Sequence, residues 1–291
     1  LEVDTPVLAP NLIPETCLEV FRTESFDGCV LDINSAYPAA MSEPLPTRLV
    51  ENGIGVPPSD NGSLFLVAAT VNSTGEDGSV FHRRERGPLK GKLLFPSGVI
   101  RGVFTLEELR SCGELGACDF EVHRWWRYEA EPWLETLMRS WYDRRRVATD
   151  EFDRYCLKIL INSVSGKLIE RDDYSHVTQD AKEALKAEAA GARVGIIDIG
   201  PHRLYDIQTR HVGPLRHAAA AAHVTARARA KLLAALHAAE EPAYCDTDSV
   251  HGKQQVTNSD ALGEWKHELS YEKAQYLAPK VYRLDAGGSG A

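Results

Sequence analysis

The sequence predicts an α+β fold, in which helices back an antiparallel sheet. Three features support this fold class: an apolar strand that ends at Asp32, a long alanine-rich helix at 215–239, and a strand after that helix which carries Asp246 and Asp248. A strand with an aspartate, a long helix and a strand hairpin with paired aspartates suit a helix-backed antiparallel sheet. The 291 residues, 43% of them hydrophobic, suffice for one large domain or two smaller ones.

The first part of the chain is predicted to hold strands, loops and one short helix. Apolar runs typical of buried strands lie at 29–33, 64–71 and 93–96. The stretch 1–28 contains several prolines, and 47–63 holds many Gly, Pro, Asn and Ser residues, so both are expected to form loops. Thr105, followed three residues later by Glu108, predicts the capping box of a short helix that extends to Arg110.

The next part is predicted to be mainly helical. A helix expected at 131–149 is followed after a very short turn by a second helix at 151–168, and two helices joined this tightly form an antiparallel hairpin. On the second helix Lys158, Asn162 and Ser165 stand at i, i+4 and i+7 and therefore share one face. Beyond the hairpin, the predicted elements are a helix at 181–192, a strand at 195–200 and the helix at 215–239.

Composition and charge limit the possible functions. The formal net charge of −9 argues against nucleic-acid binding, because affinity for phosphates comes largely from Lys and Arg. The distribution of charge matters more than its sum, however, and basic residues gather at 83–92, 144–146 and 227–231. No run of 18 apolar residues occurs, so no membrane-spanning helix is expected. The six scattered cysteines favour buried reduced thiols over disulfides or a zinc site.

The most informative feature is a pair of aspartates two residues apart. In an extended strand residues i and i+2 point to the same face, so Asp246 and Asp248 would bring their negative charges together. Such carboxylates repel each other unless a cation or a shared proton compensates. With Asp32 as a third carboxylate they would form an oxygen-rich site typical of magnesium in two-metal nucleotidyl transfer. Without the pair, Asp32 would be interpreted as a strand-end capping residue.

Four motifs together resemble those of the family B DNA polymerases. Asp32-x-x-Ser35-x-Tyr37-Pro38 is similar to their motif A, and Lys158-x-x-x-Asn162-Ser163-x-x-Gly166 is similar to motif B. Tyr244-x-Asp246-Thr247-Asp248-Ser249 is similar to motif C, and Lys280-Val281-Tyr282 resembles the Lys-x-Tyr motif that contacts the primer strand. The motifs follow the order of the family and cover nearly the whole chain. The compact layout is similar to the protein-primed branch of phages and linear plasmids.

The resemblance implies a division of the chain into subdomains. A polymerase palm would be built from 1–46 and 170–291, with a palm-associated insertion at 47–130 and a helical-hairpin fingers subdomain at 131–169. No exonuclease domain is expected, since the sequence at 2–5 does not match the Asp-x-Glu signature of that domain. The thumb is expected to be largely absent, since the sequence stops where a thumb would begin. The start lacks an initiator methionine and a signal peptide, so a piece of a longer protein is expected.

The resemblance also implies roles for individual residues. Asp32, Asp246 and Asp248 would be catalytic and hold two Mg²⁺ ions, for which Mn²⁺ can substitute. The residues implied to bind the incoming nucleotide are Ile33, Asn34, Ser35, Ala36, Tyr37, Arg144, Arg145, Lys158 and Asn162, with Arg146 as a further candidate in the same run. Those implied to contact the primer and DNA are Ser163, Gly166, Thr247, Lys280 and Tyr282. The expected partners are primer–template DNA, dNTPs and a terminal protein primer, with no membrane, in the cytoplasm of a prokaryotic host of a phage or plasmid.

Several alternatives stay open at this point. Ser165 stands where motif B usually carries a tyrosine, which weakens the expected aromatic contact to the nascent base pair. A degenerate polymerase-like module that binds DNA or a partner without activity is therefore the alternative to an active enzyme. A primase-like or terminal-transferase enzyme on the same palm is a third possibility. A reverse transcriptase is disfavoured, because its paired aspartates are adjacent whereas Thr247 separates them here.

Overall fold

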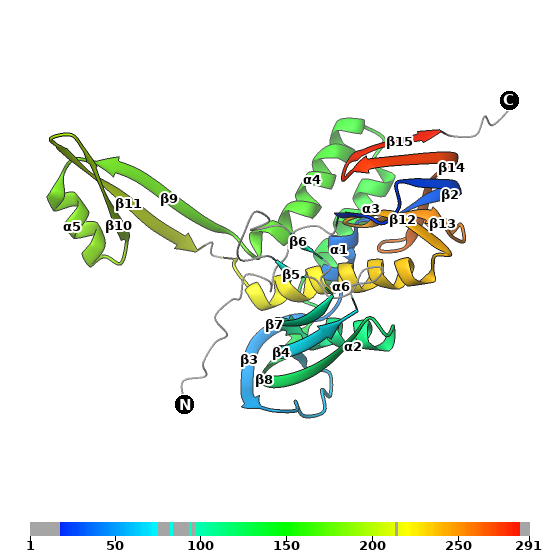
Figure 1. The fold of residues 1–291 in the computed structure, drawn as a ribbon, viewed down its shortest axis with the longest axis horizontal. Coiled ribbons are helices and arrows are strands. Elements are labelled where there is room, and N and C mark those ends of the chain that lie inside the picture. The colour runs from blue at the N-terminus through cyan, green and yellow to red at the C-terminus, as the bar shows by residue number, and fades with distance from the viewer. Residues whose placement is uncertain (1–17, 75–81, 84–92, 95–96, 213–214, 286–291) are drawn as a thin grey trace. The chain divides into compact units, whose positions relative to one another are not determined.

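The computed structural model describes residues 18–74, 82–83, 93–94, 97–212 and 215–285 (Figure 1). The chain forms two compact units. The first consists of Leu1–Ser165 and Ala218–Ala291, and the second of Gly166–His217. The sequence placed 170–217 within the second part of the palm, whereas the structure gives this stretch to a compact unit of its own.

The first unit contains a six-stranded antiparallel sheet in the order β1-β12-β13-β2-β14-β15. Its strands are β1 (Leu18–Val20), β2 (Glu24–Ile33), β12 (Glu241–Asp246), β13 (Ser249–Lys253), β14 (Trp265–Ala278) and β15 (Val281–Asp285). The apolar run predicted at 29–33 is the end of β2, which lies near the centre of the sheet. Ser249 on β13 is the register partner of Asp32 on β2, so the sheet places the predicted motif A and motif C side by side.

A second sheet of the same unit has four strands in the order β3-β8-β4-β7. They are β3 (Leu45–Ile54), β4 (Leu64–Ser73), β7 (Gly98–Thr105) and β8 (Cys118–Glu131), and a separate short pair consists of β5 (His82–Arg83) and β6 (Leu93–Leu94). The loop predicted at 47–63 is thus wrong for 47–54, which belong to β3. β3 is an edge strand whose pairing with β8 shifts register twice between Pro46 and Glu51, and edge strands with bulges tolerate proline and glycine. Local composition could not reveal this pairing with a strand 80 residues away.

Helix α6 (Ala218–Ala238) lies between the two sheets in Figure 1. Its Leu232 and Leu236 pack with Cys245 and Val250 of the six-stranded sheet. Its Ala219 and Ala222 pack with two side chains of the four-stranded sheet, Leu66 and Trp126. Alanine side chains let a helix approach a sheet closely, which explains why an alanine-rich helix joins both layers. No helix in the described part of the chain is long and apolar enough to cross a membrane.

The remaining helices of this unit begin near the predicted positions, except α1, which the sequence did not predict. They are α1 (Ala36–Met41), α2 (Leu106–Glu114), α3 (Glu135–Val147) and α4 (Glu151–Lys167), whose last residues enter the second unit. Thr105 caps α2 as predicted, since its Oγ1 accepts from the Glu108 amide at 3.2 Å. The Glu108 carboxylate does not complete the capping box and binds Arg229 instead. Asp150 caps α4 by accepting from the amides of Phe152 and Asp153.

The second unit is a three-stranded antiparallel sheet with one helix. It contains β9 (Arg171–Thr178), α5 (Ala181–Ala189), β10 (Arg193–Ile199) and β11 (His202–Val212), and the strand order is β10-β11-β9. Asp180 caps α5, whose Ala184 is buried, as is Ile207 on the central strand. The helix and β10 agree with the elements predicted at 181–192 and 195–200. The free cysteines also agree with prediction, since Cys29, Cys112, Cys118 and Cys245 are buried and Cys156 partly so, while Cys17 lies outside the described residues.

Candidate active site

Two of the three predicted aspartates lie together at one end of the central strands. Asp32 is near the end of β2, and Asp248 follows in the turn between β12 and β13. The Ile33 amide donates to the Asp248 carbonyl oxygen at 2.8 Å, which ties the two segments together. Burial raises the pKa of Asp32 to about 7, and the charges of Asp248 and Glu268 add to the effect. Burial, followed by the charge of Asp246, raises the pKa of Asp248 to about 6.

The two raised pKa values describe a site in which the nearby lysines do not supply enough positive charge to offset burial and charge repulsion. A divalent cation beside Asp32 and Asp248 would supply it, and carboxylate oxygens are the ligands that Mg²⁺ prefers. No group of three or more His, Cys, Asp or Glu side chains among the described residues is arranged to hold a metal ion. The carboxylates of Asp32 and Asp248 therefore fit a Mg²⁺ ion only if substrate phosphates and water supply its other ligands.

Asp246 is held by other partners and does not join Asp32 and Asp248 in the cavity. Its Oδ2 accepts from the Tyr244 hydroxyl at 3.3 Å and lies 3.5 Å from Lys280 Nζ, while its Oδ1 accepts from Thr247 Oγ1 at 3.0 Å. Thr247 has a φ of 60°, in the left-handed region, and so forms the tight turn that separates the two aspartates. Alternation along a strand therefore does not set where Asp246 and Asp248 point, because the strand ends at Asp246. Their negative charges still lie close together, since the charge of Asp246 raises the pKa of Asp248.

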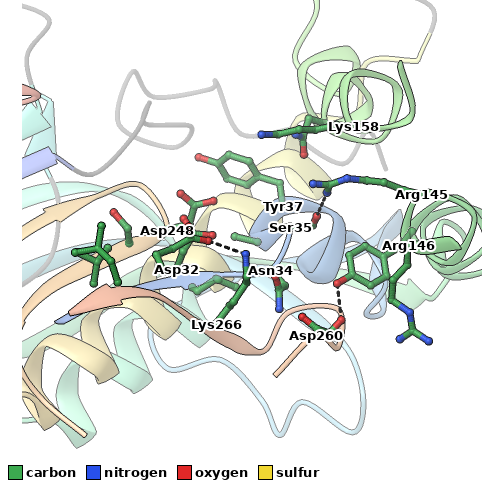
Figure 2. A pocket seen from close by; sticks show the side chains of 18 of the residues that line it. Asp32, Asn34, Ser35, Tyr37, Arg145, Arg146, Lys158, Asp248, Asp260 and Lys266 are labelled. Atoms are coloured by element: carbon green, nitrogen blue, oxygen red, sulfur yellow. Dashed lines mark hydrogen bonds and ion pairs between the residues drawn. The ribbon is translucent and has the colours of Figure 1, made fainter. Parts of the chain in front are cut away.

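A cavity of about 1150 Å³ opens beside Asp32 and Asp248. Figure 2 shows the two aspartates on one side and Lys158 and Arg145 on another, with Ser35 and Tyr37 between them. The predicted site residues that line the cavity are Asp32, Ile33, Asn34, Ser35, Ala36, Tyr37, Arg145, Lys158, Asn162, Asp248 and Tyr282. The predicted residues that do not line it are Arg144, Ser163, Gly166, Asp246, Thr247 and Lys280.

The basic wall of the cavity comes from helices α3 and α4. Arg145 donates to Ser35 Oγ at 3.0 Å, which links α3 to the start of α1. Arg146 and Arg154 line the cavity as well, whereas Arg144 does not. The sequence analysis did not predict Arg154 as a site residue. It stands one helical turn before Lys158, however, and so shares the face of that lysine. The wall therefore holds four cations from two helices.

The floor of the cavity contains further residues that the sequence did not identify. Lys266 is the register partner of Asp32 on β14, and its Nζ lies 3.0 Å from Glu268 Oε1. Both residues line the cavity, with Asp260 and His251. Their signal in the sequence is weak, because only the pairing of β14 with β2 brings them beside Asp32.

Two of the backbone amides that follow Asp32 already donate hydrogen bonds within the protein. The Ile33 amide donates to Asp248 O and the Asn34 amide to Glu264 O, at 2.8 and 2.9 Å. Ile33 and Asn34, which the resemblance implies to bind the nucleotide, therefore have backbone amides that already have partners. Ser35 has a φ of 54° and precedes the first turn of α1, so the chain reverses direction there and Tyr37 reaches the cavity.

The Lys-x-Tyr motif packs directly against motif C. The Lys280 amide donates to the Tyr244 hydroxyl at 3.1 Å, and Lys280 has a φ of 63° in the turn between β14 and β15. The Tyr282 ring lies 5.4 Å from that of Tyr244 and 5.2 Å from that of His251, measured between ring centroids. The turn at Lys280 and the start of β15 are thus fixed to the strand that leads into the paired aspartates.

Comparisons with known proteins find similarity in sequence and in fold. No protein-family model matches the chain. The DNA-directed DNA polymerase of Enterobacteria phage PRD1 is 29% identical over 153 residues, which are 50% of this chain and 27% of that protein. Phi29 DNA polymerase with primer–template DNA and incoming nucleotide has a similar fold, with a TM-score of 0.69, 19% identity and coverage of 95% of this chain and 51% of that one.

A second structure of Phi29 DNA polymerase, with primer–template DNA alone, gives a TM-score of 0.65 at 18% identity and covers 95% of this chain. The chain spans about half the length of these polymerases. The resemblance of the chain to the family B DNA polymerases, and within them to the protein-primed branch, is confirmed by its sequence similarity to the PRD1 enzyme and by its fold.

Proposed function

We propose that the chain is the catalytic core of a template-directed DNA polymerase, which transfers a nucleotidyl group from a dNTP to a primer 3′-hydroxyl or to the hydroxyl of a protein primer. One observation carries the proposal: Asp32 and Asp248 face a cavity whose opposite wall holds Arg145, Lys158 and two further arginines. A pair of carboxylates beside a cluster of cations suits a triphosphate that arrives with divalent metal. The similarity to the PRD1 and Phi29 polymerases supports the same reaction class.

The carboxylates and the metal divide the chemistry between them. When bound, two Mg²⁺ or Mn²⁺ ions would neutralise charge at the α-phosphate and lower the pKa of the attacking hydroxyl. Asp32 and Asp248 would hold these ions together with oxygens of the substrate. Asp246 would act indirectly, because its bonds to Tyr244 and Thr247 hold the turn that presents Asp248.

The cationic wall would bind and orient the triphosphate. Lys158 offers a point charge, while Arg145, Arg146 and Arg154 offer planar donors that suit phosphate oxygens. Asn162 extends the same face of α4. Tyr37 would lie under the deoxyribose, where its ring would collide with a 2′-hydroxyl and so select dNTPs over rNTPs.

The DNA would contact residues outside the cavity as well as Tyr282 at its edge. Lys280 and Tyr282 would steady the primer end, since both pack against motif C. Ser163, Gly166 and Thr247 are proposed to contact the DNA near the nascent pair. The palm would then comprise the six-stranded sheet, and α3 and α4 the fingers, in a protein that acts in the cytoplasm of a prokaryotic host.

Extension of a labelled primer on a DNA template tests the proposal. With Mg²⁺ and dNTPs the chain should extend the primer, and Asp248→Asn should abolish extension while it preserves the circular dichroism spectrum. A folded chain that fails to extend at any concentration, with Mg²⁺ or Mn²⁺, would contradict the polymerase function. If it still binds the primer–template, the alternative of an inactive DNA-binding module, which Ser165 favours, would replace it.

A further inference from the structure

The connection between β13 and β14 lies between the fingers helix α3 and the turn after Asp32. This connection, residues 254–264, is called the strap below. Asn34 holds it through three hydrogen bonds: its side-chain Nδ2 donates to Ser259 O, its amide donates to Glu264 O at 2.9 Å, and its carbonyl oxygen accepts from the Gly263 amide at 2.8 Å. The strap is therefore fixed to the segment that carries the catalytic Asp32.

Tyr142 binds the same strap from the side of α3. Its hydroxyl donates to the Asp260 carbonyl oxygen at 2.7 Å, a bond drawn as a dashed line at Asp260 in Figure 2. Tyr142 is buried, whereas most of α3 around it is exposed or half-buried. Burial raises the pKa of the phenol, so the hydroxyl stays protonated and remains a donor. Since Asp260 is adjacent to Ser259, the contacts of Tyr142 and Asn34 meet within two residues of the strap.

Tyr142 lies one helical turn before the arginines of the cavity. Arg145 and Arg146 stand at i+3 and i+4 from it, and side chains at these spacings share a face. All three residues line the cavity, and Arg145 also reaches Ser35. A shift of α3 relative to the strap would move both guanidinium groups away from the place where the proposal puts the triphosphate.

We propose that Tyr142 is a positioning residue, which anchors α3 to the strap through Asp260 and thereby sets where Arg145 and Arg146 meet the incoming nucleotide. This inference rests on the proposed polymerase function. The inference deepens that function, because it says that the hydrogen bond from Tyr142 to Asp260, which lies outside the reacting groups, aligns the arginines of the cationic wall. A hydrogen bond from a neutral phenol to a backbone carbonyl is removed cleanly by Tyr142→Phe, which keeps the buried ring.

The test separates nucleotide binding from chemistry. A primer ended with a dideoxynucleotide allows the dissociation constant of the next dNTP to be measured without turnover. Tyr142→Phe should raise this constant about three- to tenfold, as expected for one lost hydrogen bond. In steady-state extension it should raise KM for dNTP by a similar factor and leave kcat within about twofold. The matched control is Tyr155→Phe, which should behave as wild type. Tyr155 is an exposed residue of α4 and does not line the cavity.

A double-mutant cycle with Arg145→Ala distinguishes positioning from general stabilisation. If Tyr142 acts through the arginines, the effect of Tyr142→Phe on dNTP affinity should shrink in the Arg145→Ala background. The inference would be overturned if Tyr142→Phe left the dNTP affinity unchanged, or if its effect on that affinity were fully additive with the effect of Arg145→Ala. In both cases primer extension by the wild-type chain would still uphold the polymerase function. Absence of both extension and dNTP binding in the wild type would overturn the proposed function and this inference with it. The melting temperature of each variant verifies that the change is not a loss of fold.

Discussion

Glu108 on α2 and Arg229 on α6 form a doubly hydrogen-bonded ion pair in the interior of the first unit. The two donor–acceptor distances are 2.6 and 2.8 Å, and 8% of the Arg229 side chain and 5% of the Glu108 side chain are exposed. Next to this pair, Glu107 Oε1 accepts from Arg227 Nε at 3.0 Å, and Glu107 Oε2 lies 3.3 Å from His223 Nδ1. These contacts join the helix on the four-stranded sheet to the helix between the sheets.

Removing one partner of this pair should therefore destabilise the first unit. Glu108→Gln leaves the Arg229 charge buried without its partner, and a broken buried pair costs about 3–5 kcal/mol in the free energy of unfolding. Urea unfolding followed by circular dichroism measures the loss. Glu129→Gln is the matched control, since it breaks the exposed pair with Arg48 and should cost much less. Equal losses for the two variants would show that the buried pair has no special role.

The raised pKa values of Asp32 and Asp248 predict a dependence of stability on pH in the absence of metal. The usual pKa of aspartate is 3.8, and in the folded chain these groups reach about 7 and about 6. Between these values the folded state holds protons that the unfolded state has lost, so the free energy of unfolding falls as pH rises from about 4 to about 7. Asp32→Asn removes one titrating group. Its stability relative to wild type should therefore increase over this pH range.

Chemical denaturation in EDTA at several pH values measures that difference. Mg²⁺ should oppose the effect, since it replaces the protons as the compensating charge, and should raise the wild-type melting temperature more at pH 7.5 than at pH 5. In Asp32→Asn the gain from Mg²⁺ should be smaller. A stability difference that stays constant from pH 4 to 8 would contradict the raised pKa values, which burial of the two carboxylates chiefly causes.

Arg154 and Arg144 provide a sharp comparison of the cationic wall. Arg154 lines the cavity on the face of Lys158, whereas Arg144, which the sequence favoured, does not. Arg154→Ala should raise KM for dNTP about tenfold or more, as expected for a lost hydrogen bond to a charged group. Arg144→Ala should leave KM nearly unchanged. Steady-state single-nucleotide incorporation measures both, and the reverse order of effects would contradict the placement of Arg154 on α4 in the cavity and of Arg144 on α3 outside it.

Tyr37 allows a test of sugar selection. Tyr37→Val removes the ring that would collide with a 2′-hydroxyl, so incorporation of rNTPs relative to dNTPs should increase about tenfold or more, the range of a steric pocket wall. The ratio of kcat/KM for the two nucleotides measures this, with Tyr155→Phe again as control. An unchanged ratio would remove Tyr37 from the role of gate.

Local signals predicted the elements whose causes are local. The Thr105 cap, the paired helices at 135–147 and 151–167, and the long helix α6 all follow from capping residues and helical spacing. The strand β3 escaped prediction because it owes its conformation to pairing with β8 rather than to its own composition. The compact second unit was likewise hidden, since it depends on the pairing of β9 and β10 with β11, which lies later in the chain.

The sequence by itself determined the identity and order of the motif residues, because a chemical pattern such as Asp-Thr-Asp is legible without coordinates. It could not determine which carboxylates and cations meet, since side-chain direction depends on distant partners. Tyr244 and Lys280 hold Asp246 apart from the cavity, and the position of α3 brings Arg145 and Arg146 into it while it leaves Arg144 outside. Only the tertiary structure decided that the candidate site brings two buried aspartates, Asp32 and Asp248, into one cavity with a wall of cations.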